Sequence, residues 1–188
     1  DIMEDILVDN VDVKVFIHFK PNMNISAKNI AAKVFVRDFT HLEATSAAKI
    51  LVKDKFTQDK TDVEVSSSGR ITGNLEANDF SVDVSSSGYF SGEIWAVNLD
   101  AEATSSGDIN LSGKAKNAAL KASSAGTVDA GKLTAEISDI QASSAGNVTV
   151  ATTNQLNASA SSGGNIAVYR KGNLHIVSQN ESSGGSVT

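Results

Sequence analysis

The stretch Val63-Glu-Val-Ser-Ser-Ser-Gly-Arg-Ile71 returns 19 residues later as Val82-Asp-Val-Ser-Ser-Ser-Gly-Tyr-Phe90. Five further copies follow at near-constant spacing, with alanine or glycine in place of some serines, and two degenerate copies around Ala32 and Ala48 precede them. The chain therefore contains about nine copies of a repeat of about 19 residues. The glycines that anchor the clear copies are Gly69, Gly88, Gly107, Gly126, Gly146, Gly164 and Gly185.

Apolar and polar residues alternate within each copy. Apolar side chains stand six and four residues before the anchoring glycine and two residues after it, with polar residues between them. A period of two indicates a strand that buries one face. We therefore predict strands around each glycine, with their apolar residues in the core. Apolar residues also recur four residues after the anchor. The core residues predicted in this way are Val52, Val63, Val65, Ile71, Val82, Val84, Phe90, Ala101, Ala103, Ile109, Leu111, Leu120, Ala122, Val128, Ile140, Ala142, Val148, Val150, Ala158, Ala160, Ile166, Val168 and Val187.

A coil of about 19 residues accommodates two or three short strands joined by tight bends. Glycine suits such bends because it adopts positive φ without a Cβ clash, and small serines can stack where successive coils lie about 4.8 Å apart. The pattern predicts an all-β fold, a single-stranded, right-handed parallel β-helix (a solenoid) of about nine coils. The right hand is favoured because the six-residue period of left-handed β-helices is absent. The motifs of propellers and leucine-rich repeats are absent too.

The first 25 residues differ from the repeat. The segment Val11–Phe19 alternates, and Pro21, which has no N–H for a ladder, marks a turn or an edge. We expect residues 1–25 to form an N-terminal strand and cap region that is continuous with a β-helix over residues 26–188. No charged cap follows the last anchoring glycine, so we expect the final coil to expose an unpaired edge through which two chains could pair.

The composition argues against several classes of function. The chain has 188 residues, 16 Lys and Arg against 22 Asp and Glu, and a net charge of −6, unlike a nucleic-acid groove. It has no apolar run long enough to span a membrane and no cysteine, and its glycines form no phosphate loop, so no cofactor is expected. It begins Asp1-Ile-Met-Glu4, which leaves two alternatives: a cytosolic protein, or a signal segment outside this sequence.

A motif near the C-terminal end distinguishes this repeat from other Ser/Gly-rich sequences. It reads Ile166-Ala-Val-Tyr-Arg-Lys-Gly-Asn-Leu174. With the Ser-Ser-Gly repeats, it resembles the family described as putative auto-transporter adhesin, head GIN domain, over residues 11–188, although Leu174 replaces the usual proline. The resemblance implies a right-handed β-helix, export to the periplasm or cell surface, often as a lipoprotein, and a role in adhesion. That family has no established catalytic residues to carry over.

Acidic residues recur at two positions of the repeat and predict an acidic stripe on the surface. In register, Glu64, Asp83 and Glu102 would stack about 4.8 Å apart, and like charges so placed repel one another. Lys121 on the next coil, solvent, or a bound cation such as calcium would relieve this repulsion. A solvated face that keeps the protein soluble is the favoured interpretation. The residues of the stripe are Asp62, Glu64, Asp83, Asp100, Glu102 and Asp139.

Other side chains could also take part in chemistry. Tyr89 and Trp95 are candidates for an aromatic contact with a sugar, although core packing or partial burial of Trp95 is favoured. The serines recur in every copy, whereas a catalytic serine is unique and paired with a base, so hydroxyl ladders at corners explain them better. His18, His41 and His175 lack metal-ligand spacing and are expected to be exposed polar residues.

These observations favour a non-enzymatic, exported structural or binding module that uses an outward face of the β-helix. The partner is unknown, and a glycan or a surface protein is the class we expect. One alternative is a carbohydrate-active enzyme, a polysaccharide lyase or hydrolase, which needs two carboxylates with different pKa values in a cleft. Regular short bends throughout the chain would argue against it. The other alternative is a unit that assembles end to end.

Overall fold

The computed structural model describes residues 6–22 and 30–188, and all of its regular structure is β. The chain divides into two compact units, residues 1–36 and 37–188, and each is described by itself. The predicted boundary at residue 25 falls within 23–29, outside the described residues. That boundary, and the role of residues 1–25 as a cap, stay predictions.

A two-stranded antiparallel sheet forms the first unit. Strands β1 (Ile6–Val11) and β2 (Lys14–Phe19) pair along their whole length, from Ile6 opposite Phe19 to Val11 opposite Lys14. Asp12 and Val13 make the connecting turn with φ of 49° and 68°. Positive φ at both central residues of a two-residue loop matches the right-handed twist of the strands. The alternating stretch from Val11 to Phe19 is thus divided by a turn.

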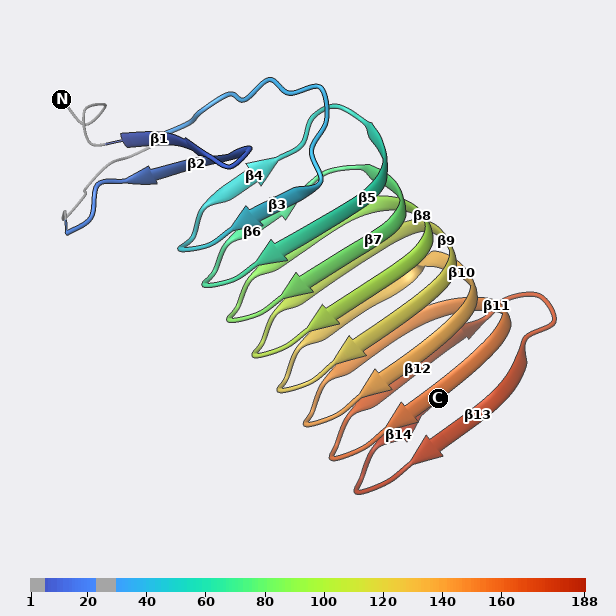
Figure 1. Ribbon diagram of the computed structural model, residues 1–188. Coiled ribbons are helices and arrows are strands. Elements are labelled where there is room, and N and C mark those ends of the chain that lie inside the picture. The colour runs from blue at the N-terminus through green and yellow to red at the C-terminus, as the bar shows by residue number, and fades with distance from the viewer. Residues whose placement is uncertain (1–5, 23–29) are drawn as a thin grey trace. The chain divides into compact units, whose positions relative to one another are not determined.

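The second unit is a right-handed parallel β-solenoid of about eight turns, close to the nine predicted (Figure 1). The degenerate copy around Ala48 forms a coil, whereas residues 30–36 contain no strand. The strands are β3 (His41–Ala44), β4 (Lys49–Leu51), β5 (Phe56–Val65), β6 (Arg70–Thr72), β7 (Leu75–Val84), β8 (Tyr89–Ala103), β9 (Asp108–Ala122), β10 (Thr127–Ala142), β11 (Asn147–Ala160), β12 (Asn165–Arg170), β13 (His175–Glu181) and β14 (Ser186–Val187).

Each coil has two long sides joined by a sharp corner and a rounded bend (Figure 1). The side that runs into the sharp corner, here the pre-corner layer, consists of β3, β5, β7, the C-terminal halves of β8 to β11, and β13. The other side, the post-corner layer, consists of β4, β6, the N-terminal halves of β8 to β11, β12 and β14. Parallel pairing joins each strand to its equivalent in the next coil, so like positions of the repeat lie in columns.

The core fills the space between the two layers, as the alternation predicted. One column runs through the post-corner layer two residues after each anchor, from Ile71 through Phe90 to Ile166, and these side chains are at most 1% exposed. Pre-corner columns face it, and the predicted core residues from Val63 to Ile166 are buried. Val52, Val168 and Val187, near the two ends of the solenoid, are only partly buried against this core. Burial of apolar side chains contributes about 25 cal/mol per Å², so these columns supply most of the stabilisation.

The sharp corners are tight turns whose positive-φ residues are the two that precede the anchoring glycine. The first of these is always serine, and the second is serine, alanine or glycine. At the first clear corner Ser67 and Ser68 have φ of 49° and 62°, and the Gly69 amide donates to the Ser66 carbonyl at 2.8 Å. This is the type I′ arrangement. The backbone also links corner to corner, because the Ser68 amide donates to the Ser86 carbonyl at 3.0 Å.

The anchoring glycines are needed for another reason than the one predicted. Gly69 and its equivalents lack positive φ, and each lies directly on the backbone of the preceding coil. A Cβ at Gly88 would lie 2.8 Å from the Val65 carbonyl oxygen, closer than real Cβ atoms approach. The predicted hydroxyl ladder is also wrong: within residues 37–188, the corner serines make no hydrogen bonds to one another through their hydroxyls, and backbone bonds join the corners instead.

Substitutions at one corner should therefore have opposite effects. Replacing Ser105-Ser106 with Asn-Gly should stabilise the solenoid by about 1 kcal/mol, because serine pays a steric cost for left-handed φ that Asn and Gly largely avoid. Replacing Gly107→Ala should destabilise it by about 3 kcal/mol, because its Cβ would collide with the Val84 carbonyl. Urea unfolding measures both. A neutral Gly107→Ala variant would contradict this account of the anchor.

A pH-sensitive contact links the two strands of the first unit. His18 Nδ1 lies 2.9 Å from the Phe19 carbonyl oxygen and Nε2 lies 2.9 Å from the Asp9 carboxylate. Both ring nitrogens face acceptors, which the doubly protonated ring satisfies best. The hydrogen bond to Asp9, followed by that to Phe19, therefore raises the pKa of His18 above its ordinary 6.5.

We expect the pKa of His18 to fall when Asp9 is replaced by Asn. The raised pKa means that this contact stabilises the sheet fully below about pH 6.5 and that the stabilisation disappears as the pH rises through the folded-state pKa. Proton NMR titration of the ring measures it. Asp12→Asn, which removes a charge from the turn of the same hairpin, is the matched control. Equal pKa values of His18 in the two variants would refute the hydrogen bond to Asp9 as the cause of the raised pKa.

Candidate functional site

Four carboxylates lie in one outward column of the pre-corner layer. The strand register places Glu43 opposite Glu64, Glu64 opposite Asp83, and Asp83 opposite Glu102, and Lys121 follows on the next coil. Parallel strands hold such neighbours about 4.8 Å apart. We call Glu43, Glu64, Asp83 and Glu102 the acidic column. Glu43 was missed from the sequence, although it stands five residues before Ala48, the position that the other members occupy in their copies.

Repulsion within the acidic column is greatest at Asp83. Partial burial and the negative charges of Glu102, Asp100 and Glu64 raise the pKa of Asp83, and Lys121 opposes this rise. Lys121 also lies 3.9 Å from the Asp100 carboxylate, so its charge is shared between two columns. The column therefore holds more negative charge than its neighbours compensate.

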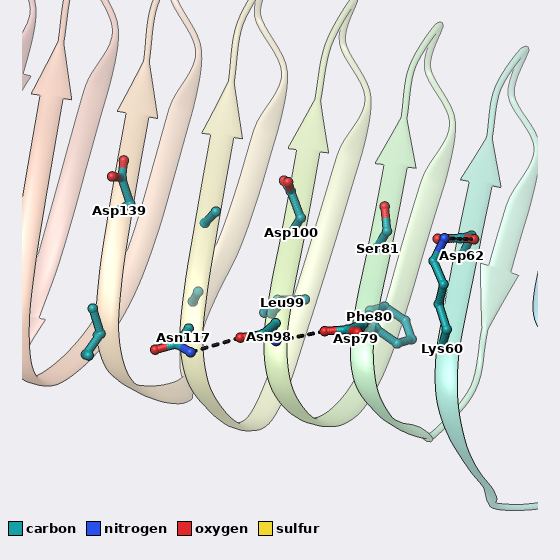
Figure 2. Close-up of a pocket in the computed structure, with 13 residues that line it drawn as sticks. Lys60, Asp62, Asp79, Phe80, Ser81, Asn98, Leu99, Asp100, Asn117 and Asp139 are labelled. Carbon is teal, nitrogen blue, oxygen red and sulfur yellow. Dashed lines mark hydrogen bonds and ion pairs between the residues drawn. The ribbon is translucent and has the colours of Figure 1, made fainter.

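The other three predicted acids lie one column away, with small residues between them. The register runs from Asp62 to Ser81, Asp100, Ala119 and Asp139 on successive strands. We call these five residues the spaced-aspartate column. The carboxylates thus stand on alternate coils, and the small side chains leave the surface hollow between them (Figure 2). The sequence placed the six acids of the stripe at two positions of the repeat, and the register gives each position a column of its own.

A third column forms the opposite wall of this hollow. Asn98 donates through Nδ2 to the Asp79 carboxylate at 2.7 Å, and Asn117 donates to the Asn98 amide oxygen at 2.9 Å (Figure 2). We call Asp79, Asn98 and Asn117 the amide ladder. Sequence reasoning missed it, although its members all stand nine residues before an anchoring glycine.

Together the spaced-aspartate column and the amide ladder flank a shallow groove of about 410 Å³ that crosses five strands, from β5 to β10. Its floor is apolar and consists of Phe80, Leu99 and Ala118, whose side chains point mostly into the core. Ile137, which is 37% exposed, stands at the end of the groove on β10. The groove therefore combines an apolar floor with polar and acidic walls.

One group of side chains has the composition of a cation site. The ligand atoms of His41, Glu43 and Glu64 lie within 4.8 Å of one another, and His41 Nε2 is 3.9 Å from the Glu43 carboxylate. A histidine with two carboxylates suits zinc better than calcium, which prefers oxygen ligands alone. The three side chains are partly or fully exposed, and within residues 37–188 no further side chain donates a hydrogen bond that would hold either carboxylate in place. The arrangement is that of a solvated face.

The aromatic candidates lie outside the groove. Tyr89 pairs in register with Arg70 of β6 in the post-corner layer, whereas Trp95 pairs with Glu76 near the start of β7, beside the rounded bend. The Arg70 guanidinium covers the Tyr89 ring at 4.1 Å, and Trp95, which is 49% exposed, lies in register between Glu76 and Lys114. Trp95 thus faces outward with about half of its side chain exposed and lies outside the core, and neither ring lines the groove.

The remaining candidates are dispersed. His18 lies in the first unit, His41 is on β3 and His175 is on β13. The corner serines that precede the anchoring glycines are exposed at the apex of each turn, with no histidine in contact. No helix among the described residues could span a membrane.

Comparison with known families agrees with the repeat. The family model described as putative auto-transporter adhesin, head GIN domain, matches residues 1–93 and 71–172. The chain belongs to this family. No curated protein and no solved structure matches it. Membership indicates a non-enzymatic module of the cell surface, and the family description points to an exported protein.

The segment Ile166–Leu174, which carries the resemblance to this family, has a structural explanation in this chain. Ile166 is buried in the post-corner column, and Tyr169 is 58% exposed near the end of β12. Gly172 adopts a φ of 65° in the bend that connects β12 to β13. The phrase thus encodes the end of a strand and a bend that a residue other than glycine would strain.

Removing one charge from the acidic column should stabilise the protein. Because the pKa of Asp83 is raised in the folded state, ionisation of Asp83 lowers the stability of the fold. This destabilisation is absent below the ordinary pKa of 3.8, grows as the pH rises toward the folded-state pKa, and is complete above it. Asp83→Asn should therefore increase the free energy of unfolding by about 0.5 kcal/mol at pH 7 and low salt, and by little at pH 3 or in 1 M salt.

Urea unfolding at the two pH values measures this effect. Asp108→Asn is the matched control, because Asp108 is exposed on the post-corner layer outside the acidic column. The same gain in both variants would show that net charge, and not the column, is responsible.

Proposed function

We propose that this chain is an exported, adhesin-like binding module, without enzymatic activity, that contacts its partner through the pre-corner face of the solenoid. The observation that carries this proposal is the coincidence on one face of a groove and an excess of carboxylates. The groove crosses β5 to β10, and the acidic column runs beside it. Unbalanced charge next to a hollow favours contact with a partner of opposite charge.

The form of the connections supports a binding role over catalysis. The bends between the strands of residues 41–188 comprise four residues or fewer, from Val52–Lys55 to Lys171–Leu174. No long loop in this part of the chain rises beside the carboxylates to exclude water. Acid–base catalysis on a polysaccharide needs two carboxylates with pKa values set apart in a cleft. The carbohydrate-active enzyme therefore remains the less favoured alternative, and end-to-end assembly stays a prediction.

A binding screen with face-specific variants tests the proposal. The chain would be applied to arrays of glycans and of extracellular-matrix proteins, and each positive would be repeated with Glu64→Lys/Glu102→Lys. These substitutions alternate the charges of the acidic column without touching the core. We expect loss of at least tenfold in affinity for the partner.

The matched control is Glu93→Lys/Asp108→Lys, which makes the same charge change on exposed residues outside the acidic column and the groove. It should leave binding within about twofold, since screened charges away from the contact contribute little. Partners that respond only to the control variant would place the contact outside the pre-corner face and would refute the proposal.

A further inference from the structure

The groove is elongated along the axis of the solenoid and has a repeating wall. Its carboxylates at Asp62, Asp100 and Asp139 stand on alternate coils, separated by Ser81 and Ala119 (Figure 2). Two coil steps correspond to about 9.6 Å, since paired strands lie about 4.8 Å apart. The three carboxylates therefore span about 19 Å in two equal steps.

Negative charge dominates the lining. Four aspartates line the groove against one lysine, Lys60, which lies 3.0 Å from the Asp62 carboxylate. Lys121 reaches Asp100 only at 3.9 Å, and Asp139 has no ion pair within the described residues. Exposed ion pairs of this kind contribute at most about 1 kcal/mol, so an incoming cation can replace them. The walls therefore favour a ligand that carries positive charges at regular intervals.

The spacing distinguishes between kinds of extended chain. Equivalent side chains of a β-strand repeat about every 6.6 Å, which does not match the carboxylates. A polyproline II segment has three residues per turn and a rise of about 3.1 Å, so every third side chain recurs on one face after about 9.3 Å. The mismatch with two coil steps is a few tenths of an ångström per turn.

The floor of the groove agrees with a peptide better than with a sugar. Phe80 and Leu99 are 2% and 3% exposed, so no aromatic face is available for stacking against a sugar ring. Trp95 and Tyr169, the exposed rings of residues 37–188, and the partly buried Tyr89 all lie outside the lining of the groove. Ile137 at the end of the groove offers an aliphatic surface against which a proline ring can pack.

We propose that the groove along the spaced-aspartate column binds an extended, basic peptide segment in the polyproline II conformation, with a cationic side chain at every third position. Asp62, Asp100 and Asp139 each receive one cation, and the prolines face the floor, at whose end Ile137 supplies an exposed aliphatic surface. This inference rests on the proposed function, because it assigns a partner chemistry to the same face.

The test uses a labelled, end-blocked peptide of three Arg-Pro-Pro units, whose first and last arginines stand about 19 Å apart. A peptide of equal composition with its three arginines consecutive is the control for charge alone. Fluorescence anisotropy at low salt measures the dissociation constant of each. We expect the spaced peptide to bind at least fivefold more tightly than the clustered one, and equal affinities would overturn the proposal.

Variants of the chain locate the contact. Asp62→Asn, Asp100→Asn and Asp139→Asn should each weaken binding of the spaced peptide about two- to fivefold, as expected for exposed ion pairs. Ala119→Arg, which fills the hollow with a positive charge, should weaken it at least tenfold. Asp108→Asn should have no effect. Thermal melts of each variant establish that the fold is retained, and unchanged affinity in the three aspartate variants would overturn the proposal.

The outcomes separate this inference from the function on which it rests. Suppose that neither peptide binds, but that Glu64→Lys/Glu102→Lys abolishes binding of a partner found on the arrays. The face then binds another kind of ligand, and the peptide assignment is wrong. The same holds if an amino-sugar oligomer binds the groove more tightly than the peptide. If no partner responds to substitutions on this face, the proposed function itself is wrong.

Discussion

Backbone hydrogen bonds between successive coils are the constraint on which the rest of this structure depends. They require each coil to return to the same place after about 19 residues, so that each strand within the stack has a partner on both sides. The corner meets this requirement with two residues in the left-handed region and a glycine that lies on the previous coil. Each of these regular corners therefore carries local backbone strain.

Stacking in columns also determines which positions of the repeat tolerate charged side chains. A residue type that recurs in the repeat meets its own copies about 4.8 Å away, whatever the length of the solenoid. Hydrophobic side chains gain from this arrangement, and amides gain as well, because each can donate to the next, as Asn98 and Asn117 do. Carboxylates stacked in this way repel one another, and this repulsion, together with partial burial, raises the pKa of Asp83. The solenoid keeps this unfavourable column on only four coils and ends it with Lys121.

The fold could be predicted from the sequence because the repeat and the period of two both depend on burial, which is a local property of each copy. Core residues from Val63 to Ile166 followed from these two patterns alone. The role of the glycines could not be predicted in this way, because it depends on the distance to the preceding coil. The same applies to the corner serines, whose φ values follow from the turn that closes the coil.

The candidate site was predictable only in part. The acids and their two positions in the repeat were recognised from the sequence, but the groove beside them and the extension of one column to Glu43 required the structure. The groove exists because Ser81 and Ala119 are small, and small residues carry no signal in a sequence where they occur at every corner. Trp95 is half exposed because its position in the repeat faces outward, which outweighs the tendency of tryptophan to be buried.

The alternation of aspartates and small residues gives the groove a period of two coils, whereas the fold has a period of one. Gain or loss of a single coil within β5 to β10 would preserve every backbone bond and yet put the two halves of the wall out of phase. Gain or loss of two coils would keep them in phase and change only the length. The solenoid can thus vary by single coils, but its acidic wall can vary only by pairs.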